Sequence, residues 1–350
     1  MAIDLTLFLS ELMASPILFV VTLLNIGVII VNGATDAPNA IATVVTTRCM
    51  RPGAAIAMAA ICNFFGLVLV TMVSSAVAST IFNMVDFGGN SEIALTALMA
   101  AMVAIIIWGV AAWYFGIPTS QSHSLIAGLT GAAIAVQGGF DGVNGWEWLK
   151  VVYGILLSTF LGFGSGWGIS KLVMVAFRHF ERQKADHFFR WAQVAAGAGV
   201  AFMHGAQDGQ KFMGIFILAI TMATAGASPE QVALPLWLML LCALCMGFGT
   251  AVGGKRIIAS VGMDMVKLEK HQGFAVSSAA TACLVLATFT GLPVSTTHIA
   301  TTAIMGVGAA RHPKSVKWSV AIDMVKTWIL TFPGCGLLGF VFAWIFMLIF

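Results

Sequence analysis

The sequence predicts an all-α polytopic membrane protein with two inverted-topology repeats, broken helices, re-entrant or hairpin helices, and 10 to 12 transmembrane segments. Three observations support this fold class. The chain is 59% hydrophobic and 9% charged, with a mean hydropathy of +0.97, whereas soluble domains carry about 25% charged residues. Its apolar runs approach or exceed the ~20 residues that a helix needs to cross a bilayer. Two polar motifs each occur twice, in the same order.

The apolar runs divide the chain into ten predicted crossings. They lack the alternation of apolar and polar residues that marks a membrane strand, so each crossing is predicted to be helical. The crossings are 14–47, 53–81, 93–115, 118–136 and 150–177 in the first half, and 191–225, 232–253, 273–290, 293–310 and 318–349 in the second.

Lys and Arg are concentrated in four connections, which all fall on one side if the N-terminus is outside. The positive-inside rule places such connections in the cytoplasm. Both termini and the connections 82–92, 137–149 and 225–231 are then extracytoplasmic, so we expect a multi-pass protein of the cell membrane. The four basic connections are Arg48 to Arg51, Arg178 to Arg190, Lys255 to Lys270, and Arg311 to Lys317.

Five crossings per half is an odd number, so the two halves are predicted to lie in opposite orientations. The halves are residues 1–177 and 191–350, and a charged cytoplasmic connector at 178–190 joins them. One crossing in each half is too long for a single straight helix. Each contains a polar run that predicts a break, at 32–39 and at 204–211, and Pro333-Gly334 is a further candidate break in the last crossing.

The paired motifs indicate an internal duplication. Gly33-Ala34-x-Asp36 recurs as Gly205-Ala206-x-Asp208. Gly116-Ile117-Pro118-Thr119-Ser120-Gln121-Ser122-His123 recurs as Gly291-Leu292-Pro293-Val294-Ser295-Thr296-Thr297-His298, and both motifs repeat after close to half the length of the chain. In inverted-repeat transporters the substrate lies near the midplane, where broken helices from both halves meet. Non-helical backbone at that depth is tolerated only inside protein or along a cavity.

Asp36 and Asp208 are ionisable groups at membrane depth, where a charge costs about 2.5–3.5 kcal/mol on insertion scales. Helix capping is one explanation for them. A cation site is the other, because hard cations prefer carboxylate, amide and carbonyl oxygen. The candidate cation ligands, with Asp36 and Asp208 as the metal-binding carboxylates for Na⁺ or another cation, are Thr35, Asp36, Asn39, Gln207 and Asp208.

Hydroxyl and amide side chains follow the proline of each hairpin motif, where a half-helix is predicted to begin. The first N–H groups of a helix lack internal partners and carry partial positive charge. Simple capping would explain one Ser or Thr, but a cluster of them at such an end favours a tetrahedral oxyanion. The candidate ligands of this oxyanion, which the resemblance described below identifies as phosphate, are Thr119, Ser120, Gln121, Ser122, Ser295, Thr296, Thr297, Gln210 and Lys211.

Lys211 lies beside a predicted break and could contact the anion, pair with Asp208, or extend toward the membrane surface. Three histidines, His123, His204 and His298, accompany the motifs. They are candidates for a proton relay or a metal contact, or for structural hydrogen bonds. Two carboxylates, one Lys and a phosphate leave a net negative cluster, which is unstable at low dielectric without bound cations. The anion is therefore expected to enter together with cations or protons.

No cofactor is expected. The six cysteines lie in or beside apolar segments, as small buried side chains do. The net charge of +3 is confined to a few loops and gives no indication of nucleic-acid binding. The predicted partners are the lipid bilayer, a small anion with Na⁺ or H⁺, and possible further copies of the chain.

At these motifs the chain resembles the PiT family of inorganic phosphate transporters, in particular the bacterial low-affinity Pit type. Residues 32–43 and the following 46–52 look like its GANDxANA block. Residues 202–211 are similar to its HGANDxQK block, and the two GxPxSxxH elements match its hairpin motifs. The resemblance covers essentially the whole chain. Thr35 and Gln207 depart from the usual Asn of GAND.

The resemblance implies an inverted-repeat symporter of the cell inner membrane that carries phosphate by alternating access. It implies phosphate coordination by the Ser and Thr hairpins and Na⁺ or H⁺ coupling at the Asp and Asn positions. The departures at Thr35 and Gln207 leave proton coupling, or transport of a metal–phosphate complex, as competitors. Other open alternatives are transport of sulfate or arsenate, an anion channel, and a membrane hydrolase that uses Ser120 or Ser122 with His123.

Overall fold

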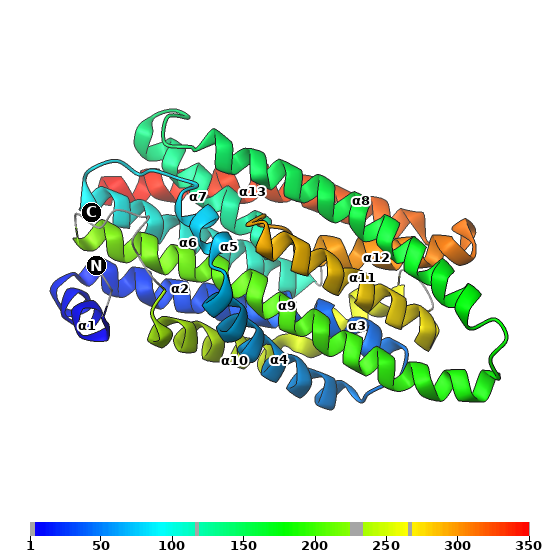
Figure 1. Ribbon diagram of the computed structural model, residues 1–350. Coiled ribbons are helices and arrows are strands. Elements are labelled where there is room, and N and C mark those ends of the chain that lie inside the picture. Colours follow the sequence, from blue (N-terminus) through cyan, green and yellow to red (C-terminus); the bar gives the residue numbers. More distant parts are fainter. Residues whose placement is uncertain (1–3, 116–118, 225–233, 265–267, 350) are drawn as a thin grey trace.

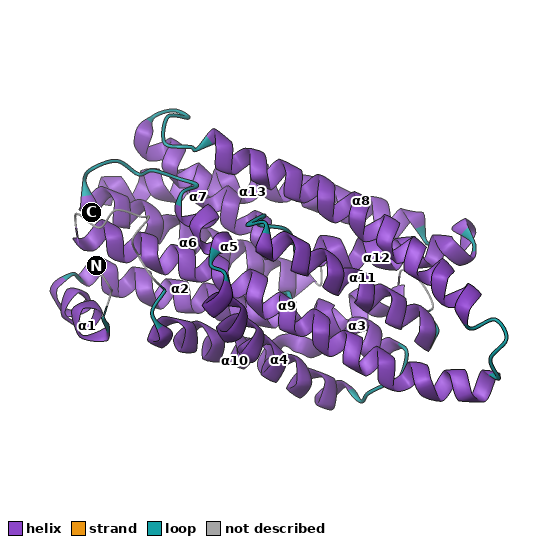
Figure 2. Ribbon diagram, in the orientation of Figure 1, coloured by secondary structure: helices purple, strands orange, loops and turns teal. Residues whose placement is uncertain are grey.

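The computed structural model describes residues 4–115, 119–224, 234–264 and 268–349, and most of these are helical (Figures 1 and 2). Seven helices within this part of the chain are long and apolar enough to cross a membrane. The chain is therefore an all-α multi-pass membrane protein, as predicted. The α-helices are α1 Leu5–Ala14, α2 Pro16–Thr35, α3 Ala37–Thr46, α4 Pro52–Val73, α5 Ala76–Phe82, α6 Ser91–Phe115, α7 Gln121–Gln137, α8 Gly145–Ala176, α9 Arg182–Thr224, α10 Leu236–Asp264, α11 Lys270–Phe289, α12 Thr296–Arg311 and α13 Trp318–Ile349.

The break predicted in the first crossing is confirmed, and it lies at Asp36. Helix α2 ends at Thr35, and α3 begins one residue later, with Pro38 in its first turn. A proline lacks the N–H that a continuous helix would need and clashes with the preceding turn. The chain therefore interrupts its helix at a carboxylate that is fully buried.

The break predicted at 204–211 is wrong, because α9 continues through it as one helix of 43 residues. This run contains no proline. Its glycines allow close helix packing: a Cβ on Gly205 would lie 2.2 Å from the carbonyl oxygen of Asn63 in α4. The polar side chains of the run find partners on neighbouring elements, so the backbone keeps its own hydrogen bonds. Helix α9 also begins inside the predicted connector, at Arg182.

Two further details differ from the prediction. Helix α13 runs through Pro333 without ending there, so the candidate break in the last crossing is also wrong. The crossing predicted at 53–81 divides instead into α4 and α5 at Ser74. The Gln210 side chain donates to the Ser74 carbonyl (2.8 Å) and accepts from the Val77 N–H (3.2 Å), which satisfies backbone groups at this division.

Helices α7 and α12 follow the two hairpin motifs and are largely buried inside the protein. Each begins at a capping serine. Ser120 Oγ accepts from the His123 N–H (3.3 Å), and Ser295 Oγ accepts from the His298 N–H (3.2 Å). Residues 116–118 of the first motif lie outside the described residues. The hydroxyl-rich ends of both helices are therefore held in protein and away from the lipid.

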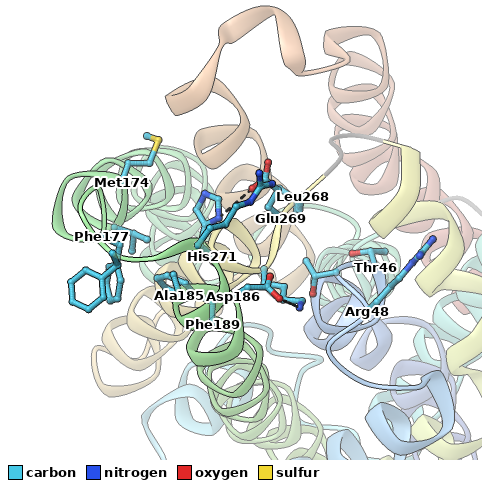
Figure 3. Close-up of a pocket in the computed structure, with 15 residues that line it drawn as sticks. Thr46, Arg48, Met174, Phe177, Ala185, Asp186, Phe189, Leu268, Glu269 and His271 are labelled. Atoms are coloured by element: carbon cyan, nitrogen blue, oxygen red, sulfur yellow. Dashed lines mark hydrogen bonds and ion pairs between the residues drawn. The ribbon is translucent and has the colours of Figure 1, made fainter.

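The basic connections gather at one end of the molecule. Arg48, Arg182 and Lys270 line one cavity of about 620 Å³, part of which is shown in Figure 3. Arg311 lies 2.7 Å from Glu269, which lines the same cavity. Both termini lie at the opposite end (Figure 1). We call the end with the basic connections the basic end. That this end faces the cytoplasm stays a prediction.

Candidate functional site

Asp36 and Asp208 meet in the interior, although they belong to opposite halves of the chain. Both side chains are at most 1% exposed. Ligand atoms of Asp36, Asp208 and His204 all lie within 4.8 Å of one another. Asn32, on the last turn of α2, donates to Asp208 Oδ2 across 3.4 Å. The two halves of the chain thus contribute to one buried polar cluster.

Asp36 is bonded by neutral donors. Asn39, one turn along α3, donates through Nδ2 to Asp36 Oδ1 at 2.9 Å. The same Nδ2 group donates to Thr297 Oγ1 at 2.9 Å. Thr297, in the first turn of α12, donates its hydroxyl to Asp36 Oδ1. The carboxylate is therefore held from both halves by an amide and a hydroxyl.

Asp208 has a cation beside it. Lys211 Nζ donates to Asp208 Oδ1 (2.7 Å), to Ser122 Oγ (2.6 Å) and to the Val294 carbonyl (2.7 Å). Lys211 is 1% exposed, so it does not extend toward the membrane surface. Its ammonium has three N–H groups, and all three are used. His204 Nε2 lies 3.2 Å from the other carboxylate oxygen, and its Nδ1 lies 3.1 Å from Asn63 Oδ1.

These two arrangements have the same plan. In each, a donor three residues after the carboxylate bridges it to a hydroxyl from the hairpin of the other half: Asn39 bridges to Thr297, and Lys211 bridges to Ser122. The two hydroxyl residues also correspond, because each directly precedes the histidine that ends its hairpin motif. Residues that the motifs pair in sequence thus make corresponding bridging contacts, with a neutral donor in one bridge and a charged donor in the other.

Some polar atoms of the cluster have no partner among the described residues. They include Asp36 Oδ2, Asn39 Oδ1 and the hydroxyl of Thr296, all of which are buried. Unpaired buried polar groups cost roughly 1–3 kcal/mol each, and more when charged. Their presence at the ends of α3 and α12 fits a site that takes a polar ligand, and carboxylate and amide oxygens suit a hard cation.

Among the other predicted ligands, Gln207, Gln210 and Thr35 are bonded within the protein, whereas the amide oxygen and nitrogen of Gln121 are buried with no partner among the described residues. Gln207 donates to the Leu292 carbonyl and accepts from Thr288, each at 2.7 Å. Gln210 lies at the division between α4 and α5, and Thr35 donates to the Val31 carbonyl on its own helix. Gln121 packs against α6, where a Cβ on Gly109 would lie 2.7 Å from its Nε2. Thr119 is buried, 8% exposed.

His123 and His298, from equivalent hairpin positions, pack on each other. Their rings are 4.4 Å apart and edge to face. Trp328 and Phe332 of α13 cover them, with ring separations of 3.6 Å to His298 and 4.6 Å to His123. This places the pair in an aromatic cluster next to the hydroxyl-bearing turns. Whether these histidines or His204 relay protons stays a prediction.

Sequence reasoning assigned no role to Asn32, Asn63 or the Val294 carbonyl. The available signal for Asn63 was an amide within an apolar run of α4; its Nδ2 donates to Thr250 in α10 at 3.2 Å. Such a residue in a membrane helix is expected to find a partner. The type of a residue does not indicate whether its backbone carbonyl accepts a hydrogen bond from a side chain, so the contact of the Val294 carbonyl could not be predicted.

A model of the Phosphate transporter family matches residues 32–339, which is most of the chain and includes every motif described above. The chain belongs to the Phosphate transporter family. This confirms the resemblance drawn from the motifs.

Two relatives are similar to this chain along nearly their whole length. A probable low-affinity inorganic phosphate transporter of Bacillus subtilis (strain 168) is 36% identical over 91% of this chain and 94% of its own. One from Rhizobium meliloti (strain 1021) is 35% identical over 88% and 90%. A solved structure described as the sodium-dependent phosphate transporter has a TM-score of 0.87 and 24% identity, covering 96% of this chain and 100% of that chain. This last likeness shows the fold.

The hydrolase alternative finds no support in this family or in the geometry. The relatives are named as transporters. Ser122 accepts a hydrogen bond from Lys211, and Ser120 caps α7. The His123 ring packs on His298 and Phe332, whereas a nucleophilic serine needs an imidazole within hydrogen-bond reach.

Proposed function

We propose that the protein is a symporter that carries inorganic phosphate across the cell membrane with a cation, Na⁺ or H⁺, by alternating access at the central site. The proposal that phosphate is coupled to a cation rests on one observation. Asp36 is buried, with neutral donors on one carboxylate oxygen and, among the described residues, no partner on the other. A buried unpaired carboxylate is costly and is expected to take up a cation or a proton.

The helix ends support an anion site next to it. Ser122 and Thr297, in the first turns of α7 and α12, bond to groups of the Asp208 and Asp36 clusters. Both turns therefore reach the central cluster, and the first N–H groups of a helix favour an oxyanion. Phosphate presents four oxygens to such donors, and the Thr296 hydroxyl, which has no partner in the described part of the chain, is a further candidate ligand.

Charge balance then favours joint movement of the two ions. Asp208 and Lys211 compensate each other, which leaves Asp36 as the carboxylate bonded by neutral groups. Phosphate adds one or two negative charges near it, and charges of one sign are strongly repulsive at low dielectric. A cation at Asp36 neutralises part of this charge, so phosphate and cation are expected to bind better together than apart.

Phosphate uptake into proteoliposomes tests the proposal. Na⁺ and pH gradients are imposed separately, and Asp36→Asn is compared with the unmodified chain. We expect one gradient to drive accumulation above equilibrium. The variant should reduce this by about tenfold or more, the equivalent of at least ~1.4 kcal/mol. Full cation-driven accumulation by Asp36→Asn would refute coupling at this carboxylate.

Competing transport modes give different results in the same assay. Uptake that only equilibrates, whatever the gradient, indicates a channel. Competition by sulfate as strong as by unlabelled phosphate indicates a general oxyanion carrier. A requirement for added Mg²⁺ or Mn²⁺ indicates a metal–phosphate complex as the cargo.

A further inference from the structure

The two equivalent bridges differ in charge, and the difference falls on a single pair of positions. Asn39 and Lys211 each bond the carboxylate three residues before them and a hydroxyl from the other half. The carboxylates and the hydroxyls are alike in type in the two bridges. The bridging donor changes, from an amide at position 39 to an ammonium at position 211.

The consequence for ion binding is direct. The Asp36 bridge contains one negative charge and no positive one, whereas the Asp208 bridge contains one of each. A mobile cation would neutralise the charge of the first bridge, whereas Lys211 already neutralises that of the second. An ammonium 2.7 Å from a carboxylate oxygen also occupies the space that a bound cation would need.

We infer that Lys211 is a built-in substitute for a second coupling cation, so that the protein binds one fewer monovalent cation per phosphate than a chain with Asn at both positions would. The inference rests on the proposed function, because it concerns how many cations accompany phosphate. It assigns Lys211 a role in setting stoichiometry, in place of the direct contact with phosphate expected from sequence.

The surroundings of Lys211 support a fixed charge. All three of its N–H groups have partners, on Asp208, Ser122 and the Val294 carbonyl, so the ammonium has no free donor for phosphate in this arrangement. A mobile monovalent cation would find the same three oxygens around it. Carboxylate, hydroxyl and backbone carbonyl oxygens are the ligands that hard cations take.

The first test replaces Lys211 with the residue found at position 39. Purified Lys211→Asn is unfolded thermally in sodium-free buffer and again with rising Na⁺, Li⁺ or ammonium. We expect a lower Tm without these cations and recovery of at least half of the loss when one of them is added. Lys150→Asn is the matched control, because Lys150 pairs with Glu147 at the same spacing, 2.8 Å away, but is partly exposed. Its Tm should not respond to cations.

The second measurement counts cations. Phosphate binding is measured at several Na⁺ concentrations and several pH values, and the slope of log Kd against log cation concentration is compared. We expect Lys211→Asn to steepen the slope by about one. The reciprocal variant Asn39→Lys, which supplies a second ammonium, should flatten it by about one while phosphate still binds.

The outcomes separate this inference from the proposed function. If the unmodified chain binds phosphate with no dependence on Na⁺ or pH, the proposed coupling fails. If that dependence exists but neither variant changes its slope, the role of Lys211 is refuted. Weaker phosphate binding by Lys211→Asn at every cation concentration, with unchanged slope, also refutes it and makes Lys211 a phosphate ligand. If Lys211→Asn does not fold, the slope of log Kd against log cation concentration in Asn39→Lys tests the role of Lys211.

Discussion

Lys211 shows what residue-scale reasoning can and cannot obtain from a sequence. Its pairing with Asp208 follows from a spacing of three residues on a helix, which places two side chains on one face. Its contacts with Ser122 and the Val294 carbonyl span 89 and 83 residues. Long-range partners of this kind depend on how helices pack, and only the paired motifs hinted at them. Thr296 and Thr297 likewise have the same chemistry in sequence but different partners in space.

Thr296→Val tests this difference. The Thr296 hydroxyl is buried and bonds to none of the described residues, so removing it should leave the Tm of the purified protein within error of the unmodified chain. If the hydroxyl receives phosphate, affinity should fall about tenfold, or ~1.4 kcal/mol, by equilibrium binding of labelled phosphate. Ser165→Ala is the control, because Ser165 donates to Leu161 on its own helix, in α8. Unchanged phosphate affinity in Thr296→Val would remove this residue from the site.

At the scale of elements, the polar runs at 32–39 and 204–211 look alike but fold differently. Pro38 accounts for the first, because it interrupts the helix beside Asp36. The second run has no proline, and its polar groups are bonded by neighbouring helices, so α9 stays continuous. The division of α4 from α5 at Ser74 was not predicted. The side chain that bonds to the backbone there, Gln210, lies far along the chain. Of these two polar runs, the one that contains a proline interrupts its helix, and the one without a proline stays helical.

Gly205→Ala tests the packing that α9 requires. A Cβ at this position would lie 2.2 Å from the Asn63 carbonyl oxygen, so the helices must separate. Overpacking of this kind costs about 1–3 kcal/mol, which should appear as a lower Tm in detergent. Gly164→Ala is the matched control, because a Cβ there meets nothing within 4 Å. Equal Tm values for the two variants would contradict the close contact between α4 and α9.

At the scale of the whole molecule, charge distribution predicted the arrangement of the ends. Connections with basic residues meet around one cavity, and the connections 82–92 and 137–149 pair with each other through Val85 and Val143. This agreement follows from counting crossings and basic residues, neither of which needs the packing of helices. Which end faces the cytoplasm depends on membrane insertion, so labelling has to decide it.

Cysteine labelling tests the sidedness. Asp141→Cys and Lys184→Cys are introduced separately, and intact cells are treated with a membrane-impermeant maleimide. We expect Asp141→Cys to react from outside and Lys184→Cys to react only after the membrane is opened, because basic loops stay in the cytoplasm. The unmodified chain, whose native cysteines are buried or half-buried, gives the background. The reverse pattern would invert the topology.

Because α9 is continuous, a movement of this helix at Asp208 would also be felt in the charged connector, residues 178–190. About 39 Å of continuous helix separates Arg182 from Asp208, at 1.5 Å per residue. If such a helix moves as one body, a change of tilt at Asp208 also displaces the connector. If cargo binding shifts α9, a fluorophore attached to the connector should report the binding of phosphate beside Asp208, whose own side chain is buried.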